Sequence, residues 1–203
     1  MARRRDVHVS ITRMADLTPA QWIADRTEEW DRLVSRGPFC FDSYARLRLI
    51  PDPDRYGQRG SEVRAVADAM NDNEQIGVVL SELASFTCTP ADCYFLVWEG
   101  WPCFHADDPM PRLTIPNRDF FLFHGAVADA ETWDSQLNAL LGAMEAPTPA
   151  FVWQADRAWC VTCDIDPHYA TIGGSADTVD AVLALTNVDV VDDRPGVEPP
   201  RYF

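Results

Sequence analysis

The sequence predicts an α+β fold, with a largely antiparallel sheet on which N-terminal helices pack. Patterns with helical spacing gather in the first half of the chain, and strand patterns gather in the second half. Several successive strand patterns are joined by connections too short for the crossover that parallel strands need. At 203 residues and 47% hydrophobic content, the chain suits one domain over 1–203. We expect flexible ends at 1–6 and 195–203.

The first helix is predicted to begin at Thr18. Thr18 suits the N-cap, Pro19 suits the first helical position, and Gln21 stands where a capping-box partner lies. Apolar side chains then recur at helical spacing until Gly37 and Pro38 end the pattern. We therefore expect one amphipathic helix over this stretch.

The same two periodicities predict the other elements. Further helices are expected at 61–70, 74–86, 129–143 and, with Ser175 as its cap, up to Leu185. Strands are expected at 41–50, 93–98, 120–123, 151–153, 158–165 and 188–191, with a proline-rich loop at 51–60 and a turn at 172–175. The strands at 93–98 and 120–123 are apolar on both alternating faces, so they should be interior strands covered on two sides.

Charge is unevenly distributed. All basic residues are Arg, and 1–64 holds 12 Arg against 10 acids, whereas 65–203 holds 5 Arg against 22 acids, for a net charge of −15. Such a surface repels nucleic acid and suits a basic protein partner. We find no apolar run of membrane-spanning length and no export signal. We therefore expect a cytoplasmic protein that binds neither nucleic acid nor membrane.

Cys160 and Cys163 have the spacing of redox dithiols and of half a zinc site. Because alternate residues of a strand point to opposite faces, this pair should point to opposite sides of the sheet. The other candidate ligands have spacings that match no common ligand pair; they are Cys88, Cys93, Cys103 and His105. We expect reduced core cysteines, no metal and no cofactor.

Alternation along the same strand also predicts burial. Trp159, Val161 and Ile165 should face the core, and Asp164 and Asp166 should end the opposite, more polar face. Two such carboxylates offer hard oxygen ligands to a divalent cation, but a solvated acidic strand end is the first expectation.

The candidate catalytic residues are Asp164, Asp166, His168 and His124. Carboxylates and imidazoles are the usual acid–base groups, so a hydrolase with an acidic site around Asp164, Asp166 and His168 is one interpretation. No Ser or Cys elbow motif accompanies them. This enzyme is therefore the alternative, and a non-catalytic protein is the first expectation.

The candidate binding residues are Trp98, Trp101, Asp156 and Arg157. Tryptophans around a strand end either pack in the core or anchor an interface. Asp156 and Arg157 lie in a predicted hairpin turn, where they suit a charge pair or a turn contact. Together with the acidic charge, these residues favour a protein-interaction module, of an immunity or regulatory type, that masks a basic partner.

Four segments resemble a family of uncharacterised actinobacterial proteins. They are FDSYAR at 41–46, YFLVWEGW at 94–101, WQADRAWCVTCDID at 153–166 and IGGS at 172–175. The resemblance covers 38–185. It implies no activity and no catalytic residues that could be transferred to this chain.

Overall fold

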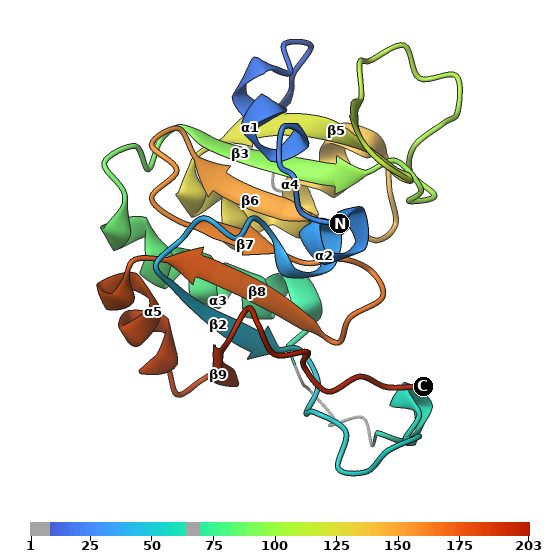
Figure 1. The fold of residues 1–203 in the computed structure, drawn as a ribbon. Helices are drawn as coiled ribbons and strands as arrows, with labels where there is room; N and C mark the ends of the chain where they lie inside the picture. The colour runs from blue at the N-terminus through green and yellow to red at the C-terminus, as the bar shows by residue number, and fades with distance from the viewer. Residues whose placement is uncertain (1–8, 64–69) are drawn as a thin grey trace, which may run out of the picture.

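The computed structural model describes residues 9–63 and 70–203. Within them, nine strands form one sheet in the order β1-β5-β3-β6-β7-β8-β2-β9, with β4 beside β5 (Figure 1). All of the paired strands run antiparallel. The predicted α+β class and the antiparallel sheet are confirmed.

The elements have the following bounds. The strands are β1 (Thr12–Arg13), β2 (Ser43–Arg48), β3 (Cys93–Trp98), β4 (Leu113–Ile115), β5 (Arg118–Gly125), β6 (Phe151–Gln154), β7 (Cys160–Thr162), β8 (Tyr169–Gly174) and β9 (Val190–Asp193). The helices are α1 (Gln21–Ala24), α2 (Trp30–Arg36), α3 (Asp72–Leu83), α4 (Trp133–Leu141) and α5 (Ala176–Leu183), and the 3-10 helices are η1 (Thr18–Ala20), η2 (Gly60–Glu62), η3 (Ala84–Phe86) and η4 (Val127–Thr132).

Helices cover both faces of the sheet. The helices α1 and α2 lie in front of it in Figure 1, and α3 lies behind it. Helix α5 packs on the same side as α3, because Val179 and Val182 share a core cluster with α3. Along β5, Phe120 belongs to the core cluster under α1 and α2, and its neighbour Phe121 belongs to the cluster under α3, α4 and α5. Leu96 and Phe95 divide in the same way on β3. Both strands are therefore covered on two sides, as their apolar sequences predict.

Three predicted helices are confirmed. Those expected at 74–86 and 129–143 are continued or preceded by 3-10 turns, as α3 with η3 and η4 with α4. Ser175 caps α5, because its Oγ accepts a hydrogen bond from the Thr178 N–H at 3.2 Å.

The helix expected to begin at Thr18 is wrong as a single element. It is interrupted between α1 and α2, where the Glu28 carboxylate pairs with Arg26 and accepts the Phe39 N–H at 2.9 Å. Although burial opposes it, these hydrogen bonds lower the pKa of Glu28 to about 2. Thr18 is not a cap either; its own N–H donates to Asp16. A long-range hydrogen bond thus overrides local helical periodicity.

Two expectations fall partly or wholly beyond the described residues. Most of the helix at 61–70 and the N-terminal end at 1–6 lie outside them.

The C-terminal tail at 195–203 lies beside the loop at 51–60, because the Tyr202 hydroxyl donates to the Pro51 carbonyl at 2.5 Å and the Phe203 N–H donates to the Gln58 carbonyl at 2.9 Å (Figure 1).

The strand expected at 158–165 is shorter than predicted. Trp159 and Val161 are buried in the cluster under α3, as expected. Ile165 is 47% exposed, so its assignment to the core face is wrong. The ladder ends at Thr162, and the chain then turns toward the cavity described below. Asp164 is buried there rather than solvated at a strand end.

Sequence reasoning missed three strands, β1, β4 and β8. The first two contain two and three residues, too few to show a periodicity. Gly173 and Gly174 suggested a turn but end β8 instead. A Cβ on Gly173 would lie 2.5 Å from the Phe41 ring, so glycine here permits close packing.

No helix among residues 9–63 and 70–203 combines the length and the apolar character needed to cross a membrane.

Candidate functional site

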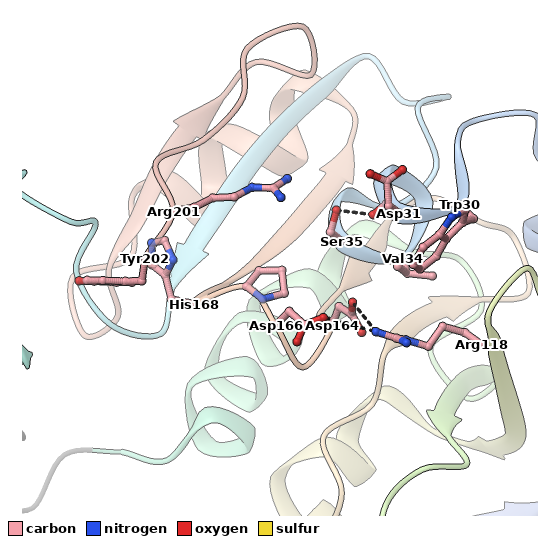
Figure 2. Close-up of a pocket in the computed structure, with 11 residues that line it drawn as sticks. Trp30, Asp31, Val34, Ser35, Arg118, Asp164, Asp166, His168, Arg201 and Tyr202 are labelled. Carbon is pink, nitrogen blue, oxygen red and sulfur yellow. Dashed lines mark hydrogen bonds and ion pairs between the residues drawn. The ribbon is translucent and has the colours of Figure 1, made fainter. Parts of the chain in front are cut away.

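A cavity of about 290 Å³ opens between α2, the start of β5, the β7–β8 connection and the C-terminal tail (Figure 2). Its lining includes Trp30, Asp31, Ser35, Arg118, Asp164, Asp166, His168, Arg201 and Tyr202. Three of the four predicted catalytic candidates, Asp164, Asp166 and His168, are thereby brought together.

Arg118 holds the two aspartates at one side of the cavity (Figure 2). Its Nη2 lies 3.7 Å from Asp164 and 3.4 Å from Asp166. Its guanidinium carbon also lies 5.9 Å from the centre of the Trp30 ring and 5.2 Å from that of Trp98. Burial raises the pKa of Asp164, although Arg118 opposes the shift. A carboxyl with a raised pKa is suited to donating a proton.

His168 is oriented by a carboxylate from another loop. Its Nε2 lies 2.9 Å from Asp52, which also binds Arg46 at 3.0 Å and Arg48 at 3.3 Å. Burial opposes ionisation of Asp52, but these donors lower its pKa to about 2. Because an ionised carboxylate only accepts hydrogen bonds, Nε2 must carry the proton.

Neither the fourth catalytic candidate nor a nucleophile completes this cavity. His124 lies on β5 beside Asp92 and Tyr94, outside the residues that line it. Among the described lining residues, Ser35 offers a hydroxyl, but it donates to the Asp31 carbonyl of its own helix at 2.6 Å. The cavity therefore presents acid–base groups without an activated serine or cysteine.

The binding candidates lie in separate places. Trp98 packs on Arg118, and Trp101 lines a hollow at the end of α4. Asp156 makes a turn contact, since it accepts the Ala158 N–H at 3.2 Å, and it also accepts the Cys88 N–H at 2.7 Å from a distant segment. The Arg157 guanidinium lies 5.1 Å from the centre of the Trp22 ring. The structure does not gather these four residues into one site.

Cys160 and Cys163 belong to different core clusters, on opposite sides of the sheet, as strand geometry predicts. Burial raises the pKa of Cys160 to about 12 and that of Cys163 further, which leaves both thiols protonated at neutral pH. In the described part of the chain, no group of three or more His, Cys, Asp or Glu side chains could hold a metal ion.

A second concavity was missed by sequence reasoning. It is a groove of about 510 Å³ between α3 and the η4–α4 segment. Three acids, Glu74, Glu131 and Asp134, line it, and no basic residue does so among those the structure describes. Two segments far apart in sequence build it, so no local motif reveals it. The sequence feature that could have indicated an acidic surface here is the absence of Arg from 70–111 and 119–156.

The groove belongs to a larger acidic layer, defined here as α3, η4, α4 and α5. These helices carry no Arg or Lys. Their eight acids are Asp72, Glu74, Glu82, Asp129, Glu131, Asp134, Asp177 and Asp180.

No protein-family model, curated protein or solved structure matches this chain. The resemblance to an actinobacterial family therefore stays an expectation.

Proposed function

We propose that the protein is a non-catalytic interaction module that binds a basic segment of a protein partner in the α3–α4 groove. The observation that carries this proposal is the groove itself, in which three carboxylates converge within a helical layer that contains no cation. A cation that enters it meets attraction from every charged helical side chain nearby. Such binding suits an immunity-type or regulatory protein that masks a basic surface.

The groove is partly organised before a partner arrives. The Asp134 carboxylate accepts a hydrogen bond from the Asn73 amide at 2.6 Å, and the Glu74 carboxylate accepts the Asn71 N–H at 2.8 Å. Fixing these carboxylates in advance lowers the entropy lost on binding. Gly77 and Val78 on the floor can contact the methylene stem of an Arg or Lys side chain, while the carboxylates bind its charged end.

A pair of matched variants tests this function. Glu131→Arg reverses an exposed charge in the groove, and Asp180→Arg reverses an exposed charge on α5, outside the groove. Both change the net charge equally. With a fluorescent Arg-rich peptide as probe, we expect Glu131→Arg to weaken binding about tenfold or more, because it places a cation where the partner's cation should bind.

The Asp180→Arg control separates a site from general charge attraction. We expect it to bind the peptide nearly as well as the unmodified protein, since long-range attraction between exposed charges is screened by salt. Equal losses for the two variants would show that only total charge matters, and the groove would then have no specific role.

A hydrolase is the second candidate, and a specific observation favours it. Asp164, with its raised pKa, shares one cavity with Asp166 and His168. Chromogenic ester and phosphate substrates offered to the intact protein test this candidate. Turnover that is lost in Asp164→Asn would support it, whereas hydrolysis at the uncatalysed rate, or hydrolysis equal in the two proteins, would reject it.

A further inference from the structure

An apolar hollow lies beyond the C-terminal end of α4. It has a volume of about 440 Å³, and its lining includes Trp101, Pro102, Leu141 and Met144. The Met144 side chain is fully exposed. The Trp101 indole N–H is buried without a hydrogen-bond acceptor among the described residues. An exposed apolar side chain at an apolar hollow marks a surface that gains from being covered by a ligand.

The hollow and the acidic groove lie at opposite ends of one helix. Asp134 and Ser135 line the groove, and Leu141 and Gly142 line the hollow. Asp134 and Leu141 are seven positions apart within α4, which places both on the same stripe of its surface. At about 1.5 Å per residue, this spacing corresponds to a separation of roughly 10 Å along the helix.

We propose that groove and hollow form a single docking surface for an extended partner segment, in which a basic residue and a large apolar residue stand about four positions apart. This inference rests on the proposed function, because the groove supplies the basic subsite. An extended chain advances about 3.3 Å per residue, so three to five residues link the two subsites.

The side chains that line the hollow favour an apolar side chain of the partner as its occupant. Met144 has a flexible, polarisable side chain that adapts to aliphatic or aromatic partners. Glu145 also lines the hollow, together with His105, and continues the negative charge of the groove toward it.

Peptide display on the intact protein tests the pairing of the two subsites. A random peptide library is selected in parallel on the unmodified protein, on Glu131→Arg and on Met144→Glu. On the unmodified protein we expect enrichment of Arg or Lys with a Leu, Met or aromatic residue three to five positions away. The Glu131→Arg selection should lose the basic preference, and the Met144→Glu selection should lose the apolar one. Each variant should bind the enriched peptide about tenfold more weakly.

The outcomes separate this inference from the proposed function. Enrichment of basic residues without an apolar partner at fixed spacing would overturn the paired surface and leave the basic groove intact. Recovery of no basic preference would overturn both. Val197→Glu, which alters an exposed apolar side chain in the C-terminal tail, is the matched control for Met144→Glu. If it weakens peptide binding as much as Met144→Glu does, the hollow is not the apolar subsite.

Discussion

The two faces of the sheet differ in how their charged side chains are placed. On the face covered by α1 and α2, arginines are buried in ion pairs, as in Arg36 with Asp193 at 2.6 Å and Arg46 with Asp52 at 3.0 Å. Arg36 is only 1% exposed. On the other face, the acidic layer carries eight acids and no cation.

This difference distinguishes charged groups that stabilise the fold from charged groups that are free to bind a partner. A buried ion pair loses much stability when one partner is removed, because the other charge is left desolvated. Exposed carboxylates such as those of Glu131 and Asp180 contribute little to folding and remain accessible to an external cation. The first face therefore uses its charges to hold the tail and loops in place, and the second face can use its charges in binding.

The largest expected effect concerns the apolar core under the acidic layer. Trp159 is fully buried, and its indole N–H donates to the Leu83 carbonyl at 2.8 Å. We expect Trp159→Ala to lower the free energy of unfolding by about 5 kcal/mol, since it empties a large site and leaves that carbonyl unpaired. Urea unfolding measures the change. The control is Asp166→Asn, which should alter stability by less than about 0.5 kcal/mol because its carboxylate is largely exposed. The reverse order would show that the assigned strand register is wrong.

The ion pairs of the opposite face should give the next largest effect. We expect Arg36→Ala to lower the free energy of unfolding by about 2 to 3 kcal/mol, because the buried Asp193 would keep only its longer contact with Arg46, at 3.4 Å. Chemical denaturation provides the measurement, and Arg194→Ala, at an exposed pair with Asp192, is the control. Similar stabilities for the two variants would contradict the structural role assigned to the buried pair.

Asp52 should give a smaller loss that depends on pH. Its pKa is lowered to about 2 in the folded protein from an ordinary value of 3.8, so the ionised form favours folding. We expect Asp52→Asn to cost about 2 kcal/mol at neutral pH. The difference between the two proteins should persist above about pH 4 and disappear as the pH falls toward 2. Denaturation curves across this range test the sign, with Asp54→Asn as the exposed neighbour control; a gap that widens in acid would refute it.

The smallest effect on stability is expected in the groove. Glu131 is exposed and makes no hydrogen bond or ion pair among the described residues, so Glu131→Gln should change the free energy of unfolding by less than about 0.5 kcal/mol. Its affinity for the Arg-rich peptide should nevertheless fall severalfold at low salt, and the difference should shrink near 0.5 M NaCl because salt screens exposed charges. A large loss of stability would make Glu131 a structural residue.

Elements with an unbroken local pattern were predictable from the sequence. The apolar spacing of Ile76, Val79, Leu80 and Leu83 defines α3, and the apolar alternation of β3 and β5 defines two doubly covered strands. The proximity of Asp164, Asp166 and His168 in sequence also anticipated one side of the cavity. In each case, residues close in sequence carry the information, because helix and strand periodicities are local properties.

Only the tertiary structure decided the features that depend on residues far apart in sequence. The Phe39 N–H bound to Glu28 interrupts the first helix, and Asp52 orients His168 from another loop. The acidic groove exists only because α3 packs against η4 and its Asn73 binds Asp134 of α4. The sequence by itself determined the α+β class, the doubly covered strands and the concentration of negative charge after residue 64. Packing alone decided where acidic residues line a groove and where arginines pair with them in the interior. Such long-range contacts are set by the whole core and not by any local pattern.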